Sequence, residues 1–156
     1  IIFEPKRRYW LKGEVDFSDT SFDPFSAQVV REGTDATIVA YGPLVPVALA
    51  AAEAAVEDGR SIEVIDLRSI SPLDVPTVAA SVAKTGRLIV AHEAPTFGGM
   101  GGELAAAITE RCFYSLQAPV IRVGGYYMPY PVSRVEEEYV PDIDRILEAV
   151  DRAFDY

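Results

Sequence analysis

The sequence predicts an α/β fold: a doubly wound, mostly parallel sheet with helices on both faces. Three observations support this prediction. Short apolar runs alternate along the chain with longer segments of helical periodicity, which is typical of parallel strands joined by crossover helices. Some of the runs are apolar at consecutive positions, as in strands buried on both sides. Glycine closes two of the helical segments, at Gly59 and Gly86.

Five strands are expected. The first, residues 27–31, has the length of a short edge strand, and the second, residues 36–41 (ATIVAY), is the continuous apolar run of a central strand. The others are expected at residues 61–67, 88–91 and 119–123.

Four helices are expected between and after these strands, at residues 46–57, 75–84, 103–113 and 142–154. Asp74 is the expected N-cap of the second helix, and Pro76 falls in its first turn, where a missing N–H costs nothing. The glycine-rich string PTFGGMGG is expected to form a loop before the third helix.

The chain divides into two expected segments. Residues 1–26 have an irregular composition and are expected to form a linker, and residues 27–156 are expected to form the α/β domain. The chain opens on Ile1-Ile2-Phe3 without an initiator methionine, so we expect it to be the C-terminal part of a longer polypeptide.

Charge and composition limit the classes of partner. A net charge of −10 disfavours nucleic acid and anionic membrane surfaces, which call for clustered Lys and Arg. No apolar run approaches the roughly 20 residues that cross a bilayer. The single cysteine, Cys112, cannot form an internal disulfide and is expected to be a half-buried thiol. We therefore expect the cytosol or another reducing compartment.

The C-terminal segment concentrates the acidic residues. Residues 135–156 contain eight acids and only two bases, Arg145 and Arg152. Such a segment is either a solvated face or a docking surface for a basic partner.

Two features resemble parts of an active site. His92 and Glu93 lie at the end of the strand expected at residues 88–91, but adjacent strand residues point to opposite faces, so we expect a structural or interface role for His92. The string GGMGGE could cradle an anion at a helix start, but it matches no phosphate-binding spacing, and Glu103 would repel a phosphate. A tight crossover is the preferred interpretation. We therefore expect no catalytic, cofactor-binding or metal-binding residues in this chain.

The segment after the last strand, residues 124–131 (GGYYMPYP), favours an interface. Tyrosines are typical anchors of protein–protein contacts, and this segment carries more of them than a core requires.

Several strings resemble the beta subunit of thiamine-dependent 2-oxoacid dehydrogenases, of the pyruvate and branched-chain types. The resemblance extends from Ile1 to Tyr156. The strings are FEPKRRYW, EGTDATIVAYG, EVIDLRSISPLD, KTGRLIVAHEAP, FGGMGGE, QAPVIRVGGY with PYP, and YVPDIDRILEAV.

This resemblance implies the C-terminal, transketolase-like half of such a subunit. The other half would be a pyrimidine-binding domain that completes the thiamine diphosphate and Mg²⁺ site with an alpha subunit. The implied partners are the alpha subunit and a second beta subunit, in a tetramer of two alpha and two beta chains. A further implied partner is the basic subunit-binding domain of the acyltransferase core.

The resemblance also implies where the acyltransferase would dock. The residues concerned lie after the strand expected at residues 119–123 and at the end of the chain: Tyr126, Tyr127, Asp151, Asp155 and Tyr156. Many relatives have an Asp where this chain has Tyr127, which removes one ion pair, and Asp151 or Asp155 could substitute.

The expected function is therefore assembly and docking within a complex that oxidatively decarboxylates a branched-chain 2-oxoacid and acylates lipoyl groups. The isolated chain is expected to be inactive. Two alternatives stay open: a pyruvate-specific member of the same family, or a non-catalytic α/β module that binds an anionic small molecule.

Overall fold

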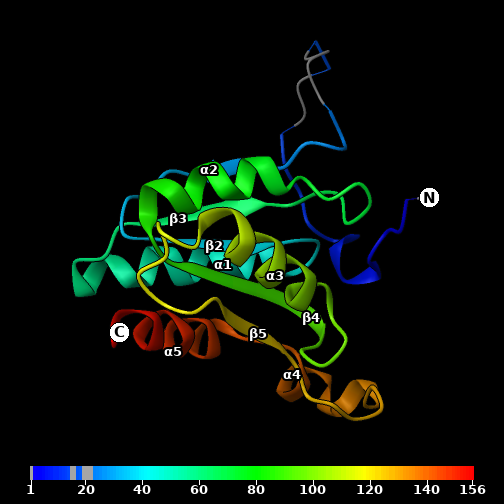
Figure 1. Ribbon diagram of the computed structural model, residues 1–156. Helices are drawn as coiled ribbons and strands as arrows, with labels where there is room; N and C mark the ends of the chain where they lie inside the picture. Colours follow the sequence, from blue (N-terminus) through cyan, green and yellow to red (C-terminus); the bar gives the residue numbers. More distant parts are fainter. Residues whose placement is uncertain (1, 15–16, 19–22) are drawn as a thin grey trace.

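A computed structural model describes residues 2–14, 17–18 and 23–156, which build one five-stranded sheet with helices on both faces (Figure 1). The strands are β1 (Gln28–Arg31), β2 (Ala36–Ala40), β3 (Ile62–Asp66), β4 (Leu88–Pro95) and β5 (Ile121–Gly125). Their order in the sheet is β1-β3-β2-β4-β5. The pairs β3–β2, β2–β4 and β4–β5 are parallel, and β1 joins β3 antiparallel. The predicted mostly parallel, doubly wound sheet is confirmed.

The helices form one layer on each face. Helices α1 (Leu44–Ala54) and α5 (Ile143–Phe154) cover one face, and α2 (Val75–Thr85) and α3 (Met100–Cys112) cover the other (Figure 1). The side chains of β2 alternate between these layers: Ile38 packs with α1 and α5, and Val39 packs with α2 and α3. Every residue of β2 is buried, as its continuous apolar sequence predicted.

The local signals at the helix ends are confirmed. The Asp74 carboxylate accepts a hydrogen bond from the Thr77 N–H at 3.1 Å and caps α2. Gly86 follows α2 with φ 74°, and Gly59 follows the 3₁₀ turn Ala55–Asp58 with φ 72°. Both angles are left-handed, which explains glycine at these two stops.

Several boundaries were predicted wrongly: β5 begins and ends two residues later than expected, and α1 begins at Leu44 rather than at residue 46. Helix α3 begins at Met100 rather than at residue 103, so part of the expected glycine loop is its first turn. Strand β4 continues to Pro95, past the predicted end at residue 91. Between β5 and α5 the structure adds two short elements that had not been predicted, a 3₁₀ turn at Ser133–Val135 and helix α4 at Glu136–Tyr139.

The first residues contact the sheet through one arginine. A 3₁₀ turn covers Lys6–Arg8, and the Arg8 guanidinium donates to the Gly42 carbonyl beyond the end of β2. Parts of the predicted linker, residues 1, 15–16 and 19–22, lie outside the described residues. The division at residues 26 and 27 stays a prediction.

Cys112 is more deeply buried than its sequence pattern predicted. Its side chain lies between α3 and α2, and Sγ is 3.6 Å from the Ala79 carbonyl oxygen. Within the described ranges, no helix is long and apolar enough to cross a bilayer.

Candidate functional site

Strand β4 holds the residue that most resembles a catalytic group, His92. Its side chain is completely buried. The Gly101 N–H donates to Nε2 at 3.1 Å, so Nε2 carries no proton, and Nδ1–H donates to the Ala94 carbonyl at 2.8 Å. Both ring nitrogens are therefore engaged by the backbone.

Burial lowers the pKa of His92, because a charged imidazolium would lose its hydration; the Ala94 carbonyl opposes this shift. Protonation at Nε2 would also break the bond from Gly101. A buried neutral imidazole with two backbone partners is poorly placed for acid–base catalysis. The geometry gives His92 the structural role that the sequence favoured.

Three glycines surround the imidazole. A Cβ atom at Gly99 would lie 2.7 Å from His92 Cε1, one at Gly101 would lie 2.7 Å from Nε2, and one at Gly124 would lie 3.1 Å from Cε1. These glycines come from the start of α3 and from β5, so one side chain joins three elements. Close packing around His92 therefore explains Gly99 and Gly101 of GGMGG, as the crossover interpretation expected.

The start of α3 does not form the anion cradle that was the alternative. The Gly101 N–H, one of the amides that such a cradle would use, is already bound by His92. Among the described residues, no group of three His, Cys, Asp or Glu side chains could hold a metal ion. The start of α3 therefore does not present the Gly101 amide to the diphosphate of a thiamine cofactor.

An aromatic surface lies on the loops that follow β4 and β5. We define it as Phe97, Tyr126, Tyr127, Met128 and Tyr130. All five side chains are exposed, Tyr127 by 77%. The rings of Phe97 and Tyr127 are 4.7 Å apart between centroids, so the loops after β4 and β5 meet here. Exposed, mutually packed aromatic side chains are typical of an interface.

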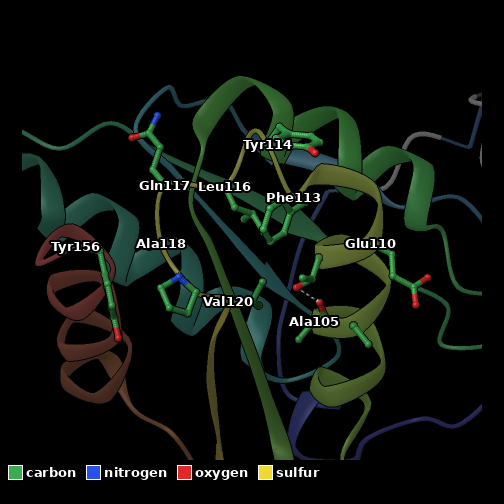
Figure 2. A pocket seen from close by; sticks show the side chains of 12 residues that line it. Ala105, Glu110, Phe113, Tyr114, Leu116, Gln117, Ala118, Val120 and Tyr156 are labelled. Carbon is green, nitrogen blue, oxygen red and sulfur yellow. Dashed lines mark hydrogen bonds between the residues drawn. The ribbon is translucent and has the colours of Figure 1, made fainter.

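The chain end borders a groove of about 1050 Å³. Figure 2 shows Tyr156 on one side of it and Phe113 on the other, with Ala118 and Val120 between them. The lining is mostly apolar, and Tyr156 is 74% exposed. The terminal residue thus lies beside a surface that could accept an apolar side chain.

The structure separates the five predicted docking residues into two groups. Tyr126 and Tyr127 lie near the start of α5, where the Arg145 guanidinium covers the Tyr126 ring at 4.7 Å. Asp151, Asp155 and Tyr156 lie at its other end. A helical rise of about 1.5 Å per residue places Arg145 and Phe154 about 14 Å apart. One small partner domain would need to span that distance to contact both groups.

Asp151 is the weaker of the two substitute acids. Its carboxylate forms an ion pair with the Arg60 guanidinium, and both side chains of this pair are partly exposed to solvent. The pair leaves Asp151 less available to a basic partner than its sequence position suggested.

Sequence reasoning missed the arginines of this region. Arg60 and Arg87 contact the Phe154 ring, with their guanidinium carbons 4.7 and 4.5 Å from its centroid. Arg122, Arg145 and Arg152 line a second cavity beside the aromatic surface. Of these five arginines, only Arg145 and Arg152 stand out in the sequence, because they are the two basic residues of an otherwise acidic segment.

The fold defines a class of protein: an α/β domain built on a mostly parallel five-stranded sheet with helices on both faces. The chain belongs to the transketolase C-terminal domain family, whose model matches residues 26–146.

Two relatives show which proteins of this family the chain resembles. The pyruvate dehydrogenase E1 component subunit beta of Leifsonia xyli is 55% identical over 156 residues, which are 100% of this chain and 46% of that protein. The 3-methyl-2-oxobutanoate dehydrogenase subunit beta of Mycobacterium tuberculosis is 49% identical over 97% of this chain and 44% of its own length. The chain thus spans less than half the length of these relatives.

A solved structure agrees in fold. A split-gene transketolase, described as an inactive beta4 tetramer, superposes with a TM-score of 0.73 and 30% identity. The match covers 92% of this chain and 46% of that one.

Proposed function

We propose that the chain is the C-terminal half of the beta subunit of a 2-oxoacid dehydrogenase, and that it serves subunit assembly and docking. The observation that carries the proposal is the end-to-end match to such beta subunits, 55% identical over the whole chain in one case. Relatives of the pyruvate and the 3-methyl-2-oxobutanoate types both match along nearly all of the chain. The substrate is therefore proposed only as a 2-oxoacid of one of these two types.

The proposal assigns thiamine diphosphate and Mg²⁺ to the parts of the enzyme that correspond to the relatives' other half and to an alpha subunit. One observation supports this assignment: both ring nitrogens of His92 are engaged by the backbone. We expect the purified chain not to turn over a 2-oxoacid when thiamine diphosphate and Mg²⁺ are added.

Docking would use the aromatic surface and the chain end. The proposal gives the negative charge at docking to Asp155, whose side chain is exposed. A basic subunit-binding domain of an acyltransferase fits this charge. Because these groups are exposed, their attraction would be screened by salt.

Titration calorimetry with the subunit-binding domain from the same organism tests docking. We expect saturable binding that weakens when salt is raised and when Tyr156 is deleted. Tyr9→Ala is a matched control, because Tyr9 is an exposed tyrosine that lines neither the groove beside Tyr156 nor the aromatic surface. Absence of binding at low ionic strength would refute the docking role.

A further inference from the structure

A second cavity, of about 290 Å³, lies where β5 ends against α5. We call it the arginine cavity and define it by Arg122 on β5 and Arg145, Glu148 and Arg152 on α5, which all line it. Thr96, Gly124 and Tyr127 complete its wall. Three cations around one small cavity are unusual in a chain whose net charge is −10.

Two of the guanidinium groups are held in place by backbone carbonyl groups. Arg145 donates to the Gly124 carbonyl from Nη2 and to the Tyr139 carbonyl at 3.2 Å from Nη1, and it stacks on the Tyr126 ring. Arg122 donates from Nη1 to the Thr96 carbonyl at 3.2 Å. Carbonyl groups orient a guanidinium but do not cancel its charge, and each side chain keeps further N–H donors.

The cavity's positive charge is only partly balanced. Within the described parts of the chain, no carboxylate forms an ion pair with Arg122, Arg145 or Arg152. By contrast, Arg31 and Arg60 elsewhere each pair with an acid. Glu148 is the one acid in the lining, so the three arginines and Glu148 leave the cavity with a net charge of +2.

We propose that the arginine cavity binds a small dianionic oxyanion of the phosphate or dicarboxylate class. The net charge of the lining matches a dianion, and the cavity's volume suits a small molecule. Guanidinium groups bind phosphate and carboxylate oxygens through paired N–H donors, and preorganised groups lose little entropy on binding. The site differs from the start of α3, whose Gly101 amide is bound by His92.

The arginine cavity shares Tyr126 and Tyr127 with the proposed docking residues. The two proposals nevertheless concern ligands of opposite charge, because docking requires a basic partner whereas the arginine cavity attracts an anion. The anion titration uses the chain without a partner, so failed docking would say nothing against an anion.

The test is nitrogen-15 NMR of the 156-residue chain titrated with inorganic phosphate and, separately, with succinate. Ionic strength is held constant with sodium chloride at pH 7.5. We expect saturable shifts of the Gly124 and Gly125 amides and of the arginine Nε–H groups. A response to phosphate alone assigns a phosphate ligand, a response to succinate alone assigns a dicarboxylate, and a response to both supports the shared chemistry.

Three variants make the result specific. Arg122→Gln and Arg152→Gln should each weaken the apparent affinity by about tenfold, because each removes one charge-assisted contact. Arg111→Gln removes the same charge from the far end of α3 and should change the affinity by less than about twofold.

Shifts that follow ionic strength rather than the anion, or that are the same in Arg152→Gln as in the parent chain, would overturn the proposal. Binding of a hexaglutamate peptide without binding of either small anion would also overturn it, and would assign the cavity to an acidic protein segment.

Discussion

At the scale of single residues, His92 shows how a catalytic-looking side chain becomes a structural one. Its ring joins β4 to the start of α3 through Gly101 and lies against Gly124 of β5. The His92 imidazole thereby accepts a hydrogen bond from the Gly101 amide, which has no acceptor within the helix. The glycines around it follow from this packing and not from ligand binding.

The lowered pKa of His92 predicts a specific dependence of stability on pH. The folded chain keeps the ring neutral while the unfolded chain takes up a proton below the ordinary value of 6.5. The free energy of unfolding should therefore fall as the pH falls through 6.5. Between pH 7.5 and 5.5 it should drop by up to about 1.4 kcal/mol more in the parent chain than in His92→Gln.

Urea denaturation of both proteins at the two pH values measures this difference. His92 is the chain's only histidine, so the comparison isolates one group. An equal pH dependence in the two proteins would show that the imidazole is not held neutral by the fold.

The glycines of α3 give a second prediction with a matched pair. Gly101→Ala should destabilise the fold by about 1–3 kcal/mol, since its Cβ would lie 2.7 Å from His92 Nε2. Gly102→Ala meets only the Arg122 side chain, at 3.5 Å, and should stabilise the helix by about 0.5–1 kcal/mol. Denaturant midpoints distinguish the two. If both substitutions shifted the denaturant midpoint by a similar amount, close packing against His92 would not be the reason for glycine at position 101.

At the scale of elements, the attachment of α5 depends on Phe154. Arg60 and Arg87 contact its ring, and Arg87 Nε also donates to the Ala153 carbonyl at 2.9 Å. The last turn is thus fixed to the rest of the fold by two cations and one hydrogen bond. This attachment positions Asp155 and Tyr156.

Replacing Phe154 by Leu should lower the free energy of unfolding by about 1–2 kcal/mol, because it removes two cation–π contacts. Hydrogen exchange should become faster in the last turn of α5 and change little in α2. Phe113→Leu is the control, because Phe113 is an exposed phenylalanine that packs on Tyr114 and not on an arginine. Unchanged exchange in α5 would mean that the ring does not anchor the helix.

The sequence predicted those elements whose signals are local. The apolar run of β2 and the cap of α2 at Asp74 are set by neighbouring residues, and both were predicted correctly. The first turn of α3 was missed because glycine is a poor helix former, and what holds Gly101 there is a histidine nine residues earlier. Helix α4 was missed because four residues carry too little periodicity.

The candidate site was predictable to the same extent. The exposure of Tyr126 and Tyr127 could be inferred from a loop rich in Tyr and Pro. The arginine cavity could not, because Arg122 and Arg152 are brought together only when α5 packs beside β5. Whether the five predicted residues dock a partner stays a prediction.

At the scale of the whole molecule, the two helix layers and the locked β4–α3 crossover leave the chain's distinctive side chains on its outside. The aromatic surface, the groove beside Tyr156 and the arginine cavity all face outward. Such surfaces fit the proposed role, in which the domain contributes contacts to a larger enzyme. The chain's match to less than half the length of its relatives is consistent with that role.

The most direct test of the central claim is a chimera. This chain replaces the matching 46% of the Leifsonia xyli pyruvate dehydrogenase E1 component subunit beta, and the product is co-expressed with that enzyme's alpha subunit. The corresponding segment of the Mycobacterium tuberculosis subunit beta, a relative of the chain at 49% identity, serves as the control. Oxidative decarboxylation of pyruvate by the purified assembly is then measured. We expect the chimera to assemble with the alpha subunit and to turn over pyruvate. Failure to assemble, while the control chimera assembles and is active, would contradict the assignment of this chain as the C-terminal half of a beta subunit.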